Sequence, residues 1–148
     1  MKSKNSNYLA AEKLLSKGGN QSDALPLLEA AVEEGDTPAM YALGTWYLFG
    51  NAVRKNVAKA IRLIRIAAED NVADAAYDLA VSYELGTGVK KNLDLAAKFY
   101  LRAFLFGDKQ AGVELERLLY WDLKQISAKM MSREIGRYLA SIGVAAAE

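Results

Sequence analysis

The strongest constraint on the fold of this chain is an internal repeat of 36 residues. When each residue is aligned with those 36 and 72 positions later, small and apolar side chains coincide without any shift of register. The clearest matched sets are Ala39, Ala75 and Ala111; Leu43, Leu79 and Leu115; Ala24, Ala60 and Ala96; and Ala31, Ala67 and Ala103. A period of this length indicates a stack of similar units, each of which packs on its neighbours.

Each unit is predicted to consist of two helices joined by a turn. The apolar residues of 38–49 follow helical spacing, with Thr37 as the expected N-cap and Gly50 as the residue that ends the helix. Asn56 then caps a second helix over 57–70. The alanines recur where the two helices approach each other, because a larger side chain would push the axes apart from their usual distance of about 8–10 Å.

The repeat organises the whole chain, 1–148, as a single all-α domain of about eight helices. Its parts are a short N-terminal helix pair over 7–36, full repeats over 37–72 and 73–108, a partial repeat over 109–126 and a C-terminal capping helix over 127–143. Individual helices are expected over 7–17, 22–34, 74–85, 93–106 and 109–126, besides the two already described. The capping helix carries an apolar stripe without the repeat signature, made of Met131, Ile135, Tyr138, Leu139 and Ile142. We expect it to cover the open end of the stack, and the final residues, GVAAAE, to fray.

The turn between the helices occurs twice, as YLFGNAVRKN at 47–56 and as YELGTGVKKN at 83–92. Where the second copy has Gly88, the first has Ala52. Glycine adopts a positive φ freely, whereas alanine does so only at a cost. The first turn is therefore predicted to be the more strained. A phosphate-binding loop is the other interpretation of GTGVKK, but this segment follows a helix and lacks the G-x-G-x-x-G pattern.

The pattern ALG..Y..G..V..N...A......AA resembles the Sel1-like repeat, a relative of the tetratricopeptide repeat. The resemblance is strong over 39–111. The second unit contains Gly86, Gly88 and Asn92 and is the closer match. The first unit departs from the pattern at Ala52. The resemblance implies a right-handed α-α superhelix of antiparallel helix pairs, and a scaffold for protein complexes with no catalytic residue to carry over.

Composition excludes several kinds of chemistry. The chain has no cysteine and no histidine, so it contains no disulfide, thiolate nucleophile, imidazole base or zinc site of the usual ligand types. Its net charge of +1 indicates no strong attraction to nucleic acid or membrane. The N-terminus lacks the apolar segment of a secretory signal, and we expect a cytoplasmic protein without metal or cofactor.

Neither the paired carboxylates nor the basic residues indicate a catalytic or a nucleic-acid site. Neither Glu33 with Glu34 nor Glu114 with Glu116 shares a helix face, and no nucleophile elbow is present, so a cryptic hydrolase is a remote alternative. The turns and second helices carry the basic residues Arg54, Lys55, Arg62, Arg65, Lys90, Lys91, Lys98 and Arg102. A solvated convex face is predicted for them. Nucleic-acid binding is a second remote alternative, because its footprints are usually more strongly basic.

The first helices are expected to line a concave groove of the stack. Positions two residues to either side of the buried stripe turn toward that groove. They are Tyr41, Thr45, Phe49, Tyr77, Val81, Glu84, Arg117, Tyr120 and Trp121, with Leu48, Leu85 and Val113 beside them. Tyr, Trp and Arg dominate the hot spots of protein interfaces, so these residues are predicted to bind a protein partner. The alternative is that some of them, Tyr120 and Trp121 above all, belong to the core.

The sequence therefore favours a non-enzymatic module, such as an adaptor, that binds one dedicated protein partner through an aromatic-rich concave groove. The resemblance supplies a second hypothesis, an immunity or inhibitor protein that neutralises a bacterial toxin or effector, a role that small Sel1-like proteins fill. Both hypotheses stay open on the sequence alone. A monomer is favoured, although Leu9, Leu14 and Leu15 offer an N-terminal face on which a second copy could stack.

Overall fold

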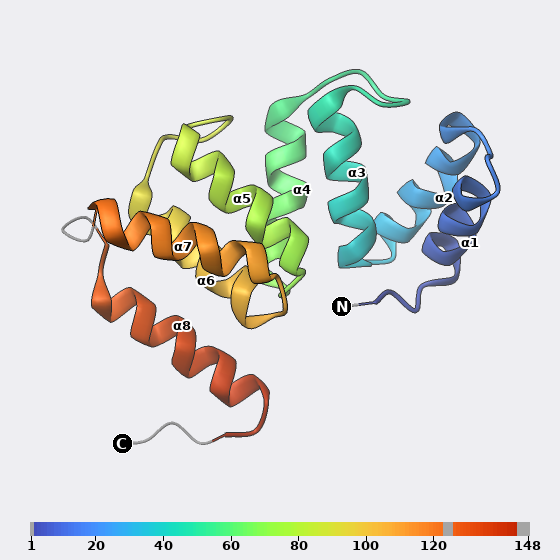
Figure 1. The fold of residues 1–148 in the computed structure, drawn as a ribbon. Coiled ribbons are helices and arrows are strands. Elements are labelled where there is room, and N and C mark those ends of the chain that lie inside the picture. Colours follow the sequence, from blue (N-terminus) through green and yellow to red (C-terminus); the bar gives the residue numbers. More distant parts are fainter. Residues whose placement is uncertain (1, 123–125, 145–148) are drawn as a thin grey trace. The chain divides into compact units, whose positions relative to one another are not determined.

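The computed structural model describes residues 2–122 and 126–144, which form helices and connecting turns without a strand (Figure 1). The helices are α1 (Ser6–Ser16), α2 (Gln21–Glu33), α3 (Thr37–Phe49), α4 (Val57–Glu69), α5 (Ala73–Leu85), α6 (Leu93–Leu105), α7 (Lys109–Asp122) and α8 (Ala128–Ser141). The predicted all-α class is confirmed. The bounds of α1 to α6 lie within one residue of those expected from the repeat.

The C-terminal part departs further from the expected bounds. The described part of the helix expected over 109–126 is α7, Lys109–Asp122. Part of that expected helix, residues 123–125, and most of the tail expected to fray, residues 145–148, lie outside the described residues. Ile126 is a buried residue at a bend before α8. The helix of the partial repeat therefore does not reach residue 126, where its pattern predicted its end.

Short polar side chains begin the helices. Asn56 and Asn92 cap α4 and α6, as predicted, since each side-chain oxygen accepts a backbone N–H hydrogen bond of 3.0 Å. The predicted N-cap Thr37 is wrong, because Asp36 caps α3. Thr37 is instead the first helical residue, and its hydroxyl donates to the Asp70 carboxylate at 2.5 Å. Two neighbouring polar residues both suit an N-cap, and only the backbone geometry distinguishes them.

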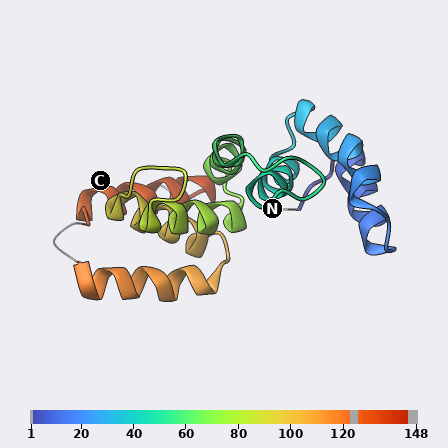
Figure 2. The same cartoon turned by 90° about the horizontal axis from the view of Figure 1, so that it is seen from above.

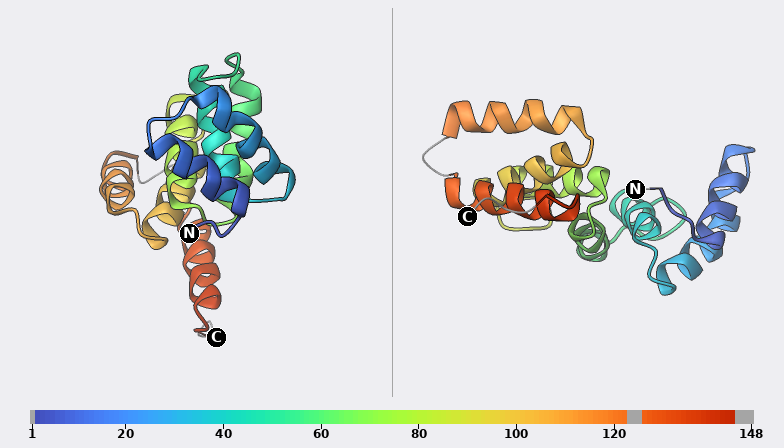
Figure 3. Two further views of the ribbon diagram at one scale, coloured as in Figure 1. Left: turned by 90° about the vertical axis from the view of Figure 1, so that its right-hand side faces the viewer. Right: turned by 90° about the horizontal axis from the view of Figure 1, so that it is seen from below.

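The chain divides into two compact units, Met1–Val72 and Ala73–Glu148. In the first unit α1 packs on α2, α2 on α3 and α3 on α4, and in the second unit α6 packs on α5, α7 and α8. Figure 2 and Figure 3 show α7 and α8 apart from each other in the second unit. The alanines of the repeat lie fully buried in the two units, at Ala24, Ala31, Ala60, Ala67, Ala96 and Ala103. That a single domain spans 1–148 stays a prediction.

The contact between α3 and α4 shows how close the paired helices are. A Cβ atom added to Gly44 would lie 2.8 Å from Ile64 Cγ1 and 3.3 Å from the carbonyl oxygen of Ala60. No larger side chain fits at Gly44 unless α4 moves. Small residues on both helices therefore determine how closely the two helices of a pair approach each other.

The two turns have the backbone geometry that their sequences predict. Gly50 and Gly86 end α3 and α5 with φ of 78° and 75°. Ala52 has a φ of 54° where Gly88 has 70°. A left-handed conformation costs an L-residue about 1–2 kcal/mol. The prediction that the first turn is the more strained of the two is confirmed.

Exchanging the residues at this position is expected to change stability in opposite directions. Ala52→Gly relieves about 1–2 kcal/mol of strain, of which the larger backbone entropy of unfolded glycine offsets about 0.5–1 kcal/mol. The free energy of unfolding, measured by urea denaturation, should rise by about 0.5–1 kcal/mol for Ala52→Gly and fall by a similar amount for Gly88→Ala. If Ala52→Gly were less stable than the parent, the strain assigned to this turn would be wrong.

Candidate functional site

Glu84 of α5 and Arg117 of α7 form the centre of a polar network in the second unit. Arg117 Nη2 donates to Glu84 Oε1 at 2.5 Å, and Arg117 Nε donates to Glu114 Oε2 at 2.8 Å. Gln110 Nε2 donates to the other oxygen of Glu114 at 3.0 Å. Glu84 and Arg117, which the sequence predicted on one surface, are therefore in direct contact.

Tyr100 of α6 binds the second oxygen of the same carboxylate. Its hydroxyl donates to Glu84 Oε2 at 2.7 Å, and Tyr77 packs edge-on against its ring with the centroids 5.5 Å apart. Tyr100 is almost fully buried. Sequence reasoning missed it because its equivalent in the first repeat is Ile64, so the position has the periodicity of core. The hydrogen bond from the Tyr100 hydroxyl to Glu84 does not recur in the first repeat, so the sequence period gives no sign of it.

These contacts move the pKa values of the network away from neutrality. Burial first, and then the hydrogen bond to Glu84, raise the pKa of the Tyr100 hydroxyl well above its usual 10.0. Hydrogen bonds to Glu84 and Glu114 raise the pKa of Arg117, and the bond from Arg117 lowers the pKa of the Glu114 carboxyl. A neutral phenol and a permanently charged guanidinium fix neighbouring side chains, but neither is suited to proton transfer near pH 7.

Large apolar side chains lie exposed at the ends of α5 and α7. Leu85 is 69% exposed, Tyr120 is 79% exposed and Trp121 is 76% exposed. The rings of Tyr120 and Trp121 meet edge to face, with centroids 5.1 Å apart. Both aromatic side chains are therefore on the surface, which decides against the alternative that they belong to the core.

The exposed apolar residues recur at one position of the repeat. Leu85 and Trp121 are 36 residues apart, and their equivalent in the first unit, Phe49, is 70% exposed. Isolated exposed apolar side chains are common on protein surfaces. Exposure of the equivalent residue at the end of the first helix in successive units is a more specific feature, because it recurs with the period of the repeat.

The nine predicted contact residues divide between the two units. Tyr41, Thr45 and Phe49 belong to the first, where Tyr41 and Thr45 are half-buried and the Thr45 hydroxyl donates to the carbonyl of Ala42 at 2.7 Å. The others belong to the second, where Tyr77 is half-buried beside Tyr100. We use the name α5–α7 surface for Val81, Glu84, Leu85, Arg117, Tyr120 and Trp121.

Arg102, predicted on a solvated face, is instead buried. Its side chain is 2% exposed, with Nε donating to Glu134 Oε2 at 3.1 Å and Nη2 to Glu134 Oε1 at 2.9 Å. Lys98 Nζ lies 4.0 Å from the same carboxylate. The prediction is wrong because α8 packs over this face of α6. The pairing was missed because α8 lacks the repeat signature, and the residue 36 positions before Glu134 is the basic Lys98, which gives no sign of a carboxylate partner for Arg102.

Two further kinds of site are not found in the part of the chain that the structure describes. No three Asp or Glu side chains of residues 2–122 and 126–144 gather as metal ligands. No helix in the same ranges has the length and apolar character needed to cross a membrane. The α5–α7 surface is therefore the candidate site that the residues best define.

The raised pKa of Tyr100 predicts a loss of stability at high pH. In the unfolded chain the phenol ionises near its usual value of about 10, whereas the folded chain keeps it protonated to a higher pH. The stability from Tyr100 is therefore present below pH 10 and is lost as pH rises above it. Urea denaturation between about pH 9 and pH 11.5 should show this decline, and Tyr100→Phe should reduce its slope. Tyr120→Phe, at an exposed ring, is the control, and an equal slope for Tyr100→Phe and the parent would refute the assignment.

The buried pair of Arg102 and Glu134 predicts a large difference between single and double substitutions. Glu134→Ala leaves the Arg102 charge buried without its main partner, which should lower the free energy of unfolding by about 3–5 kcal/mol. Arg102→Met with Glu134→Leu replaces both charges by apolar groups and should recover most of that loss. Chemical denaturation measures both. A cost below about 1 kcal/mol for Glu134→Ala, as for an exposed pair, would show that α8 does not bury this contact.

Comparisons with known proteins agree with this architecture. The family model described as Sel1 repeat matches residues 37–72 and 73–105. The chain is similar to a Sel1 repeat protein from Oxalobacter formigenes, with a TM-score of 0.74 and 26% identity, over 91% of this chain and 57% of that one. It is also similar in fold to a protective antigen present in uropathogenic Escherichia coli strains that displays an SLR fold, with a TM-score of 0.73 and 21% identity, over 93% of this chain and 30% of that one.

The matches cover most of this chain but only part of each of the two solved structures. This chain spans little more than half the length of the Oxalobacter formigenes protein and about a third of the antigen. None of the curated proteins compared with the chain matches it. The repeat boundaries at 37 and 73 agree with those predicted from the internal period. Residues 37–105 are therefore two Sel1 repeats.

Proposed function

We propose that this chain is a non-enzymatic module that binds one protein partner, and that the α5–α7 surface provides part of the contact. The Sel1 repeats support the first part, because these repeats generally serve as protein-interaction modules. The observation that carries the second part is the exposure of Leu85, Tyr120 and Trp121. A partner would anchor on these three side chains.

The size of these side chains supports the proposal. An aromatic side chain covered by a partner removes up to about 150–250 Å² of surface from water, a gross gain of about 4–6 kcal/mol at 25 cal/mol per Å². The entropy lost on association consumes a large part of that gain. Even so, the edge-to-face pair of Tyr120 and Trp121 is of the residue types that dominate interface hot spots.

The polar network supports the proposal in a second way. Arg117 is held by Glu84 and Glu114, yet 43% of its side chain stays accessible. A long side chain that is already fixed loses little rotamer entropy when a partner binds. Arg117 therefore presents an accessible, preorganised guanidinium next to apolar anchors, an arrangement suited to a partner segment with a carbonyl group beside apolar residues.

The chemistry of the residues supports a non-enzymatic role. The chain contains no histidine and no cysteine. The phenol and the guanidinium of the network have pKa values raised further from neutrality than usual. A general acid or base works best with a pKa near the working pH, and the network moves these two groups the opposite way.

The adaptor and the immunity hypotheses differ in what the partner does. The adaptor form is the simpler proposal, because it requires only the exposed anchors and the repeat fold. The immunity form rests on the family resemblance, since no contact of the α5–α7 surface favours a toxin over another protein. Once a partner is identified, its activity with and without this chain separates the two.

Site-specific photocrosslinking tests the proposed surface. A photoreactive phenylalanine analogue at Trp121 or Leu85, in cells of the chain's own organism, should give the same discrete adduct with one protein. The control position is Ile66, which is 49% exposed on α4. With that partner purified, Tyr120→Ser with Trp121→Ser should weaken binding at least about tenfold. An adduct of equal yield from Ile66, or unchanged affinity of the double variant, would disprove the role of this surface.

A further inference from the structure

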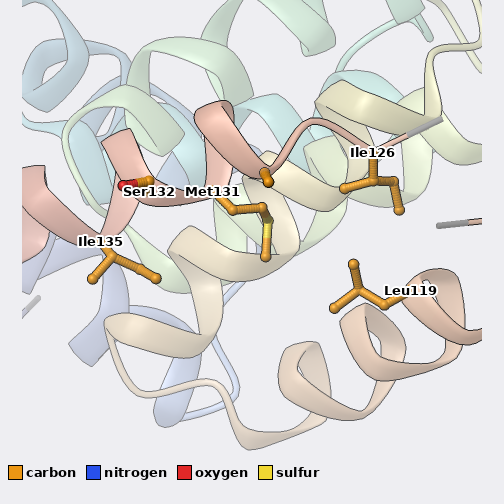
Figure 4. A pocket seen from close by; sticks show the side chains of 6 residues that line it. Leu119, Ile126, Met131, Ser132 and Ile135 are labelled. Carbon is orange, nitrogen blue, oxygen red and sulfur yellow. The ribbon is translucent and has the colours of Figure 1, made fainter. Parts of the chain in front are cut away.

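A pocket of about 370 Å³ opens between α7 and α8, on residues that the α5–α7 surface does not use (Figure 4). Its lining is formed by Leu119, Ile126, Ala128, Met131, Ser132 and Ile135. Figure 4 shows Leu119 of α7 opposite Ile126 and Met131. Ile135 is 42% exposed, so the pocket is an apolar groove that solvent reaches. Its volume is within the range of about 300–1,000 Å³ that binding pockets have.

The repeat shows which side chains fill this position in a closed helix pair. In the preceding repeat, 36 residues earlier, Tyr83 stands at the position of Leu119 and Phe99 at the position of Ile135. These two rings stack between α5 and α6, with centroids 5.9 Å apart and planes 6° from parallel. In the last helix pair both aromatic residues are replaced by smaller aliphatic ones. The pocket is therefore the space that aromatic side chains occupy in the preceding repeat.

Two features of α8 oppose its closure over α7, a larger side chain and an ion pair with α6. The repeat positions of the buried Ala67 and Ala103 are occupied in α8 by Leu139, and a larger side chain opposes close approach of two helices. The hydrogen-bonded pair of Arg102 and Glu134 meanwhile holds α8 on α6. The groove is consequently part of the folded structure and does not require α8 to move.

The charges on α8 indicate what could cover the groove. Lys129 and Arg133 are exposed and one helical turn apart. Glu134, the single acidic residue of the α8 sequence, is turned to Arg102. On the α7 side, Glu116 precedes Leu119 by three residues and is exposed. An occupant with carboxylates on its α8 side would therefore meet basic groups there.

We propose that the groove between α7 and α8 binds an acidic amphipathic helix of a protein partner. One large apolar side chain of that helix enters the pocket between Leu119 and Ile135, and its carboxylates lie toward Lys129 and Arg133. A helix fits because an amphipathic helix lays its apolar face into a hydrophobic groove between helices. This site is separate from the α5–α7 surface, and neither requires the other.

A pair of labelled peptides tests the chemistry of the occupant. The probe is a synthetic peptide of about 14 residues with Leu and Phe at helical spacing and Glu at the flanking positions, and the matched control replaces every Glu by Lys. Fluorescence anisotropy with the full chain should give saturable binding of the acidic peptide, at least about tenfold tighter than the control. Lys129→Glu with Arg133→Glu should reverse that preference. Equal binding of both peptides, or no saturable binding of the acidic one, would overturn the proposal.

Filling the groove tests its location without risking the fold. Leu119→Tyr with Ile135→Phe restores the residues of the preceding repeat. This double variant should have an unchanged or higher thermal stability, and its affinity for the acidic peptide should fall at least about tenfold. Val113→Tyr introduces the same side chain at an exposed position of α7 and should bind as the parent does. Unchanged binding by the filled variant would overturn the assignment. Dimers in sedimentation of the parent that the filled variant loses would show that a second copy is the occupant instead.

Because the photocrosslinking positions and the groove residues differ, the two proposals can fail separately. Tyr120→Ser with Trp121→Ser should leave binding of the acidic peptide within about twofold of the parent. A larger loss would show that the peptide binds the α5–α7 surface rather than the groove.

Discussion

The close approach of paired helices is the constraint on which the rest of this structure depends. Ala60, Ala67, Ala96 and Ala103 are fully buried, and at Gly44 not even a methyl group fits against α4. Helices that pack this closely exclude water from their contact and fix where their remaining side chains point. The exposed ends of α5 and α7 can therefore present Leu85 and Trp121 without the support of further layers.

The last helix pair shows what happens when this constraint is relaxed. Leu139 replaces the alanine of earlier repeats, and α8 packs on α6 through the buried pair of Arg102 and Glu134. A buried ion pair adds little net stability compared with apolar residues of similar size, but breaking it is costly. It therefore specifies where α8 packs. The groove between α7 and α8 follows from this larger residue together with the smaller Leu119 and Ile135, which stand where the preceding repeat has Tyr83 and Phe99.

Much of the fold could be predicted from the sequence because the pattern of each kind of helix occurs more than once along the repeat. Aligned copies reveal the buried alanines, the caps Asn56 and Asn92, and the strained Ala52. The contacts that were missed occur only once. The repeat equivalent of Glu134 is the basic Lys98, so the register does not mark Glu134 as a partner of Arg102. The hydroxyl of Tyr100 binds Glu84 at a position whose periodicity is that of the core. Of the candidate site, the sequence predicted which side chains face outward on α7, but not the hydrogen bonds that hold Arg117.

The accessibility of Trp121 tests the proposed interaction surface most directly. The chain has two tryptophans, and Trp46 is buried, so Trp46→Phe leaves Trp121 as the only tryptophan. Acrylamide should quench its fluorescence strongly in the free chain and much less when the photocrosslinked partner is bound. Weak quenching in the free chain would contradict the exposed position of Trp121, and equal quenching with and without the partner would contradict its place in the interface.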